Sequence, residues 1–403
     1  MTIPFKQIAY ATCVVTALLL PITGQAATYY VSTSGNNSNP GTSTKPWRTV
    51  AYAAFKMVAG DTTYVRGGTY QEKEIRFSKS GTQSAPIKLL NAPGEFPIIN
   101  FISSSQAYRI YIRSTTSSNS KIGWITIEGF ELRNGHEGMK ISNAHDLTIR
   151  RNWIHHNGHG LLGNGTRILI DRNRIERNGS SSIYDHGIYM YGTAITVINN
   201  LIYGNKCYGI QVNGTVAYNS SVQPGPEYVT SSNWVITNNT IAYNGCSGIV
   251  LWRYTPKLRA ENNIFYENAN AKSSTVSQGI NFISVTGTGM VFRNNLAYAS
   301  GSGATKFLGT AAKQGTHYTQ SGNIVNTIKP AFVNAPATLP SSPNFALPSG
   351  SGAIDKGLVI STAKIAYNGT SRPKGSTYDV GAYEYNGSTT QLRLAAPTSA
   401  QGQ

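Results

Sequence analysis

The chain has 403 residues and a formal net charge of +17, from 34 Lys and Arg against 17 Asp and Glu. Charged residues are only 13% of the sequence, and Gly, Asn, Ser and Thr supply much of its polarity. This composition argues against a helical protein, and the length suits an elongated repeat better than one compact core.

The chain begins with the pattern of an export signal. Lys6 is followed by an apolar stretch at 8–20, and Gly24-Gln25-Ala26 offers a small-residue cleavage site. A membrane anchor is disfavoured because the stretch is short for a bilayer. We therefore expect residues 1–26 to be a signal peptide and the remainder to be secreted, either extracellular or periplasmic.

The excess of positive charge favours a polyanionic partner. Together with the export signal, it predicts a monomer that binds an acidic polysaccharide. We expect it to bind no nucleic acid and not to insert into a membrane. General solubility, or adhesion to anionic cell surfaces, stays open as an alternative reading of the charge.

Residues 27–100 are expected to form an amino-terminal cap and the first coils of a solenoid. A short stretch from Trp47 to Asp61 is compatible with a helix. Such a helix would shield the first coil from solvent.

From 101 to 329 the chain repeats one phrase, in which an apolar pair and Asn precede a second Asn five residues later. Stacked at fixed offsets, the repeats predict an all-β, parallel β-helix whose turns carry Asn ladders, with Asn supplying left-handed backbone. Gly129 would take the first column's slot one coil earlier. The first column comprises Asn152, Asn173, Asn200, Asn239, Asn263 and Asn295, and the second comprises Asn134, Asn157, Asn178, Asn205, Asn244 and Asn268.

One strand of each coil begins with Gly, as in Gly138-Met139-Lys140 and Gly187-Ile188-Tyr189. Because side chains alternate along a strand, the residue after Gly should point inward and the next outward. Tyr191, Asn213 and Trp252 should extend the outward face. The predicted outward column is Lys140, Leu162, Tyr189, Gln211, Val250 and Asn281.

Cys207 and Cys246 both lie two residues before such a Gly, in adjacent coils. Their Cα atoms should then lie within disulfide range, and we predict a bridge. Two free thiols are the alternative. The interval between these coils is extended at 218–232, which predicts an inserted loop beside the solenoid.

The repeat ends near residue 330. We expect residues 330–387 to be an irregular capping segment and 388–403 to be a disordered tail. Within the segment, residues 379–384 (Asp-Val-Gly-Ala-Tyr-Glu) are expected to form a last strand that covers the far end.

The opening resembles that of secreted right-handed β-helix proteins, including polysaccharide lyases similar to pectate lyase L. The resemblance rests on residues 29–42, 45–49 and 59–70, and on the ending at 379–384. It implies a right-handed parallel β-helix and an enzyme that cleaves acidic polysaccharide.

One feature of that lyase family is missing. The resemblance implies an aspartate cluster that binds calcium and a catalytic Lys, but Gln211 stands where such a Lys would be. After residue 26 the sequence has six aspartates, widely spread. The sequence requires no cofactor, and calcium stays open although its aspartate cluster is not seen.

The chemistry-bearing residues gather in three consecutive coils around residues 136–191. Elimination on a uronate needs a cation for the carboxylate, a base for the neighbouring proton and an acid for the leaving oxygen. The candidate catalytic residues are Lys140, His159, Asp185, His186, Tyr189 and Tyr191, and the candidate substrate-binding residues are Arg150, Arg172, Gln211 and Trp252.

Several alternatives remain beside this prediction of a polysaccharide lyase. A uronate C5-epimerase would use the same first steps, and a non-catalytic polysaccharide-binding protein would use the aromatic side chains as a platform. Hydrolysis is disfavoured because Glu137 and Asp185 are predicted to lie about 10 Å apart. A metal site at His155, His156 and His159 is disfavoured because a strand and turn would splay them.

Overall fold

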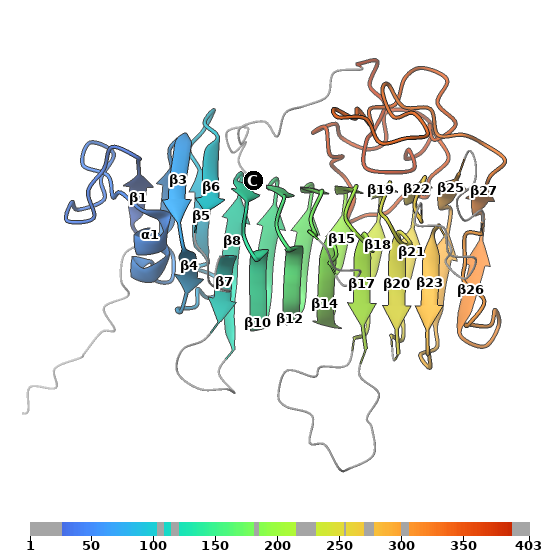
Figure 1. Ribbon diagram of the computed structural model, residues 1–403, viewed down its shortest axis with the longest axis horizontal. Coiled ribbons are helices and arrows are strands. Elements are labelled where there is room, and N and C mark those ends of the chain that lie inside the picture. Colours follow the sequence, from blue (N-terminus) through green and yellow to red (C-terminus); the bar gives the residue numbers. More distant parts are fainter. Residues whose placement is uncertain are drawn as a thin grey trace, which may run out of the picture.

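The computed structural model describes residues 26–102, 109–113, 121–180, 185–214, 231–253, 255–269, 278–299 and 306–388. It is a parallel β-helix in which strands stack along the long axis of the molecule (Figure 1). The predicted signal peptide, most of the loop expected at 218–232 and most of the tail expected at 388–403 lie outside the described residues. Among the described residues, no helix is long and apolar enough to cross a membrane.

Three parallel ribbons form the coils, and every strand pairing between coils is parallel. From residue 137 onward, the strands of the first ribbon contain or follow the repeated Gly. Its strands are β4 (Glu74–Phe77), β7 (Arg109–Arg113), the first half of β10 (Glu137–Arg150), the first half of β12 (His159–Asp171), β14 (Ile188–Thr193), β17 (Ile210–Asn213), β20 (Ile249–Trp252) and β23 (Ile280–Ile283).

The second ribbon continues from the first through the long strands β10 and β12. It contains their second halves together with β1 (Thr28–Val31), β2 (Thr62–Val65), β5 (Ile87–Asn91), β8 (Ile122–Glu128), β15 (Thr196–Ile198), β18 (Val235–Thr237), β21 (Arg259–Glu261), β24 (Met290–Arg293) and β26 (Tyr318–Ser321).

The third ribbon is a sheet of its own. It contains β3 (Gly68–Glu72), β6 (Pro97–Phe101), β9 (Glu131–Arg133), β11 (Trp153–His155), β13 (Arg174–Glu176), β16 (Leu201–Tyr203), β19 (Thr240–Ala242), β22 (Ile264–Tyr266), β25 (Leu296–Tyr298) and β27 (Ile324–Val325).

The core fills the space between the ribbons with apolar side chains stacked coil on coil. In the first ribbon, the residue after each Gly is fully buried, as predicted from strand alternation. This inward column comprises Met139, Leu161, Ile188, Ile210, Ile249 and Ile280. Burial of such a column is the main stabilising contribution to a solenoid.

Two ladders of buried Asn side chains hold the turns on either side of the third ribbon. In each rung the amide nitrogen donates to the Oδ1 atom of the next Asn, as from Asn173 to Asn200 at 3.0 Å and from Asn178 to Asn205 at 3.0 Å. The first ladder runs from Asn152 to Asn295 as predicted and continues one rung further, to Asn323.

Two positions of the predicted ladders are wrong. Phe130 and Gly135, and not Gly129 and Asn134, occupy the slots before Asn152 and Asn157, because their backbone N–H groups donate to those side chains. Asn134 is exposed. The left-handed backbone lies at the residue before each Asn of the first ladder, which is Arg at 151 and 172 and, as predicted for the turns, Asn at 199, 238, 262 and 294. The ladder Asn therefore contributes hydrogen bonds, and its neighbour makes the turn.

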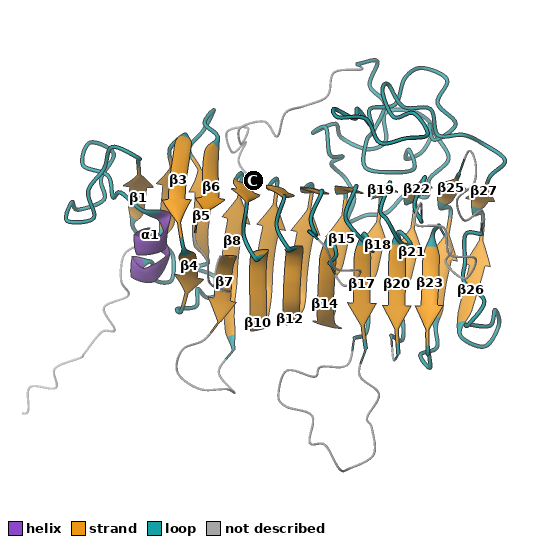
Figure 2. Ribbon diagram, in the orientation of Figure 1, coloured by secondary structure: helices purple, strands orange, loops and turns teal. Residues whose placement is uncertain are grey.

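The amino end is capped by α1 (Val50–Lys56), the short helix that the sequence predicts there, and α1 packs against β4 (Figure 2). Thr49 caps it by accepting a hydrogen bond from the N–H of Tyr52. Cys207 and Cys246 form the predicted disulfide, with their Cα atoms 4.5 Å apart.

The carboxyl-terminal segment corrects one prediction. Residues 379–384 contain no strand and do not cover the far end. They run along the side of the solenoid, where Asn238 donates to the carbonyl of Asp379 and Gly381 donates to the carbonyl of Asn262. Figure 1 shows this segment lying over β15 to β27. It covers a lateral flank because the side chains of its core pack there, as Phe345 does on Tyr203.

Candidate functional site

The candidate site is a group of aromatic side chains on the first ribbon, which we call the His–Tyr cluster: His159, His186, Tyr189 and Tyr191. They come from the start of β12 and from β14 with the residues just before it. Leu162 pairs with Tyr189, and both point outward because Leu161 and Ile188 beside them point into the core. Stacking of adjacent coils thus brings the predicted histidines and tyrosines together.

The two histidines lie in adjacent coils, with their rings in an edge-to-face arrangement. Their ring centroids are 6.0 Å apart, and the Nδ1 atom of His159 accepts a hydrogen bond from the backbone N–H of His186 at 3.4 Å. Nε2 of His159 lies 3.9 Å from Oδ1 of Asp185. Both contacts of His159 are long, so its ring nitrogens are only weakly engaged.

His186 is held more firmly and is 1% exposed. Its Nδ1 atom accepts from the backbone N–H of Tyr208 at 3.3 Å, and its ring lies 5.2 Å from that of Tyr208. Gln211 forms a side-chain hydrogen bond with it. A buried ring with these contacts positions its neighbours and is shielded from a polymer substrate.

The two tyrosines carry the accessible hydroxyl groups. The hydroxyl oxygens of Tyr189 and Tyr191 are 3.1 Å apart, and the amide of Asn213 donates to Tyr189 at 3.1 Å. The ring of His186 lies 5.5 Å from that of Tyr189. The arrangement holds two phenols side by side at the surface of the ribbon.

Burial sets the protonation state of both histidines. It lowers the pKa of His186 to about 3, assisted by the neighbouring His159. Burial also lowers the pKa of His159, although the Asp185 carboxylate opposes the shift. At neutral pH both imidazoles are therefore neutral, which is the form that can accept a proton.

Lys140 lies on the amino-terminal side of the cluster. It pairs in register with Leu162, and Leu162 pairs with Tyr189, which places Lys140 two coils, or about 10 Å, from Tyr189. Its ammonium lies 3.8 Å from Glu137, a buried carboxylate that also binds Arg109 at 2.6 Å. Lys140 thus brings positive charge beside His159 without being part of the His–Tyr cluster.

The remaining predicted residues are more scattered. Trp252 pairs with Asn213 and extends the outward face as expected. Gln211 and Val250 keep the predicted register but are buried. The ring of Tyr208 explains this, since its hydroxyl interacts with Asn281 two coils further on.

Arg150 and Arg172 lie apart from the cluster. Along β10, the left-handed residues Asn143 and Asp146 turn the chain between Lys140 and Arg150. Arg150 binds Glu128 at 2.7 Å, and Arg172 binds Asp171 at 2.7 Å. The structure therefore does not bring these arginines to the candidate site, and their role in substrate binding stays a prediction.

Sequence reasoning missed two members of the site. Tyr208 occupies the same slot before Gly as His159 and His186, which is a signal that an alignment of coils contains. Asn213 is expected on the outward face, but its hydrogen bond to Tyr189 depends on side-chain conformation.

The described residues do not fit the calcium site that the resemblance implies. Within them, no three His, Cys, Asp or Glu side chains cluster so as to hold a metal ion. Asp146 binds Arg167, and Asp171 binds Arg172, so these aspartates are already paired. We accordingly derive no chemical step through a metal.

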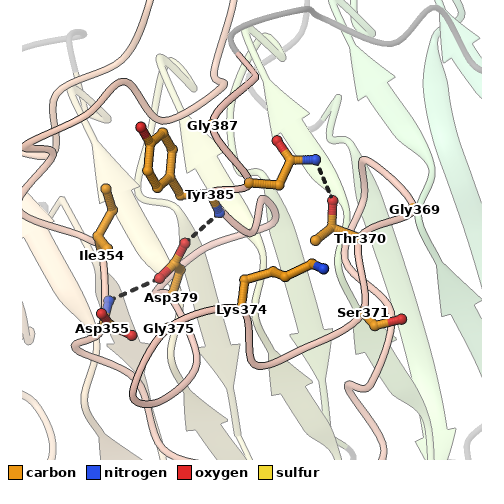
Figure 3. A pocket seen from close by; sticks show the side chains of 11 residues that line it. Ile354, Asp355, Gly369, Thr370, Ser371, Lys374, Gly375, Asp379, Tyr385 and Gly387 are labelled. Carbon is orange, nitrogen blue, oxygen red and sulfur yellow. Dashed lines mark hydrogen bonds between the residues drawn. The ribbon is translucent and has the colours of Figure 1, made fainter.

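A pocket of about 820 Å³ lies in the carboxyl-terminal segment, lined in part by Asp355, Lys374 and Asp379 (Figure 3). The Asp379 carboxylate accepts backbone hydrogen bonds from Asp355 and Tyr385, at 2.8 and 2.6 Å. Because this segment packs on the flank near Asn238 and Asn262, the pocket is separate from the first ribbon. Its carboxylate is occupied by the backbone, so the His–Tyr cluster is the stronger candidate for chemistry.

Comparisons with known proteins support the fold. Residues 29–195 match the family described as Pel9A-like, right handed beta helix region. The solved structures include pectate lyase Pel9A, 19% identical with a TM-score of 0.50, covering 89% of this chain and 96% of that one. A rhamnogalacturonan lyase is 18% identical with a TM-score of 0.53, covering 80% and 96%. At these identities the likeness shows the fold alone.

Two curated proteins match parts of the sequence. The uncharacterized protein YwoF of Bacillus subtilis (strain 168) is 28% identical over 220 residues, 49% of this chain and 46% of that protein. Pectate lyase PEL9 of Emericella nidulans is 42% identical over 76 residues, 19% and 18% of the two chains. The chain spans less than half the length of either relative. The chain is thus a right-handed parallel β-helix that is similar to the Pel9A-like region over residues 29–195, and the described strands after them continue the same parallel solenoid.

Proposed function

We propose that the protein is a secreted polysaccharide lyase that cleaves an acidic, uronate-containing polysaccharide by β-elimination. The observation that carries the proposal is the His–Tyr cluster, in which a neutral imidazole and a pair of phenols share one outward face beside Lys140. The net charge of +17 and the pectate lyase among the relatives support it.

The chemistry assigns one role to each side chain. With a uronate ring over Leu162, Lys140 would neutralise the carboxylate and so acidify the proton on C5. His159 would accept that proton, the C4–O bond would break as the C4–C5 double bond forms, and Tyr189 or Tyr191 would protonate the departing oxygen. Buried His186 would act as a positioning residue, because it contacts the rings of both His159 and Tyr189.

Among the candidate catalytic residues, Lys140 and His186 are less suited than His159 to act as the base. His186 is 1% exposed, and the Nζ atom of Lys140 lies 3.8 Å from the Glu137 carboxylate. His159 is neutral, partly exposed and loosely held, which are the properties of an available proton acceptor.

The test is to incubate the purified protein with polygalacturonate, alginate and glycosaminoglycans and to follow the ultraviolet absorbance of unsaturated uronate. A lyase releases unsaturated oligosaccharides from at least one of them. Altered uronate composition without cleavage would instead identify an epimerase. Retention on an immobilised polysaccharide without any turnover would identify a binding protein, and either result contradicts the proposal.

A further inference from the structure

We propose that a second group of side chains, the cationic platform, binds uronate carboxylates next to the His–Tyr cluster. The platform consists of Arg76, Arg109, Tyr111, Arg113 and Lys140, from β4, β7 and β10. This inference rests on the proposed function and names its ligand class as a polyuronate with unesterified carboxylates.

The strand register places the platform in line with the cluster. Arg76 pairs with Tyr111, Tyr111 with Lys140, Lys140 with Leu162, and Leu162 with Tyr189. These outward positions form one row along the solenoid axis, which spans about 19 Å at the spacing of parallel strands. Figure 1 shows β7, β10, β12 and β14 side by side along that axis.

The platform is organised around one tyrosine ring. The guanidinium groups of Arg76 and Arg109 lie 5.4 and 4.9 Å from the ring centroid of Tyr111. Arg113 donates to the Tyr111 hydroxyl at 3.4 Å, and that hydroxyl lies 3.3 Å from the hydroxyl of Ser142. Contacts with an aromatic ring hold arginine in place and lower the entropy cost of ligand binding.

The charges on the platform do not cancel. Its four cations face two carboxylates, of which Glu74 binds Arg76 at 2.7 Å and Glu137 is buried and binds Arg109 at 2.6 Å. Arg113 is exposed, and in the described part of the chain no carboxylate lies within 4.0 Å of it. Two of the four positive charges are therefore not balanced by these carboxylates and are available to a ligand.

The geometry selects the ligand. Guanidinium groups bind carboxylates through paired hydrogen bonds, and the cations stand on successive coils about 4.8 Å apart, a spacing comparable with the length of one sugar residue. A polyuronate lying along the row would place successive carboxylates on the platform and its next ring over Leu162, between Lys140 and Tyr189. A neutral glycan would gain none of these interactions.

The experiment measures binding separately from turnover. Calorimetry is carried out with galacturonate and mannuronate hexamers and with their fully methyl-esterified forms, in a Tyr189→Phe background, in which the proposed turnover is slowed. We expect at least one free acid to bind and its ester to bind much more weakly. Arg76→Gln with Arg113→Gln should weaken binding about a hundredfold, since removing each charge-assisted hydrogen bond to the ligand weakens it roughly tenfold.

The matched control is Arg48→Gln with Arg259→Gln. Arg48 is an exposed residue before α1, and Arg259 pairs with Glu261 two residues away in the second ribbon, much as Arg76 pairs with Glu74. This variant removes the same charge and should bind within about twofold of the parent, since its changes lie off the platform. Equal binding of acid and ester, undiminished binding by the platform variant, or no binding of either acid would overturn the inference.

The two proposals can fail separately. If the platform variant loses affinity but the native protein eliminates no polyuronate, the platform stands and the lyase assignment fails. If the native protein is a lyase and the platform variant keeps its KM, the lyase assignment stands and the platform fails.

Discussion

The hydroxyl oxygens of Tyr189 and Tyr191 lie 3.1 Å apart on one face of β14. Residues two apart on a strand share a face, and the amide of Asn213 donates to Tyr189 from the next coil. The pair is therefore held by its own strand and by the neighbouring coil, in the place where the proposed reaction needs a proton donor.

Replacing Tyr189 by Phe should lower kcat for polyuronate cleavage by about 10² or more, because a positioned general acid contributes a factor of this size. The aromatic ring stays, so hexamer binding should change little. Steady-state kinetics measure the effect, and Tyr64→Phe on β2 in the second ribbon serves as the control. A loss of less than threefold in kcat would exclude Tyr189 as the acid.

The pH profile should report the neutral histidines. Since burial lowers the pKa of His159, the acid limb of kcat/KM should fall below pH 6.5, the ordinary value for His. His159→Gln should abolish turnover across the whole range. An acid limb centred above pH 7 in the native protein would contradict the assignment of His159 as base.

Folding stability should depend on His186 in the same range. Its pKa of about 3 in the folded protein lies below 6.5, the ordinary pKa of His. Between pH 6.5 and pH 3 the unfolded chain therefore binds a proton at this residue that the folded chain does not bind. Stability is full above pH 6.5 and falls as the pH drops toward 3, by at most roughly 1.4 kcal/mol per pH unit.

The measurement compares urea unfolding of the native protein with that of His186→Gln between pH 7 and pH 4. The difference between the two isolates His186, because Asp379 titrates in both. Burial raises the pKa of Asp379 to about 6, so this group gives the opposite slope. Parallel stability curves for the two proteins would show that His186 is protonated in the folded state.

Removing one Asn side chain from the first ladder should destabilise the folded protein. Asn200→Ala would leave the backbone N–H and side-chain amide of Asn173 without the Oδ1 acceptor they share, inside a dry interior. We expect the free energy of unfolding to fall by about 2–4 kcal/mol, from two or more unsatisfied buried groups. Denaturant titration checks this, with Gln83→Ala, at an exposed position off the ladder, expected to change it by less than about 0.5 kcal/mol.

Arg372 should anchor the carboxyl-terminal segment. It is buried, donates to Glu384 at 2.9 Å and also donates to the carbonyls of Asp379, Gly381 and Ala382. Arg372→Ala leaves the Glu384 carboxylate buried without its cation, at a cost of about 3–5 kcal/mol. Limited proteolysis should then cleave near residue 372 much faster.

Arg167→Ala is the control for this prediction. Arg167 is exposed and pairs with Asp146, so its removal should cost no more than about 1 kcal/mol and leave the proteolysis rate unchanged. Equal cleavage rates for Arg372→Ala and the native protein would mean that the segment is held by its apolar contacts alone.

The sequence by itself determined the solenoid, the stacking of Asn173 on Asn200 and the disulfide between Cys207 and Cys246. Each coil contacts mainly the next, so a repeated offset in the sequence becomes a repeated position in space. The same argument placed His159, His186 and Tyr189 in neighbouring coils, because their distances from the repeated Gly can be counted.

Only the tertiary structure decided what lies across the coils. The ladder positions predicted at Gly129 and Asn134 are one residue too early in the chain, at the end of the solenoid where the sequence repeat is weakest. The covering of Gln211 and the contacts of Arg76 and Arg109 with Tyr111 depend on side-chain conformations. The path of residues 379–384 along the flank depends on contacts between residues more than a hundred positions apart. Such contacts follow no period, because they are made once in the molecule, by side chains that reach across the coils.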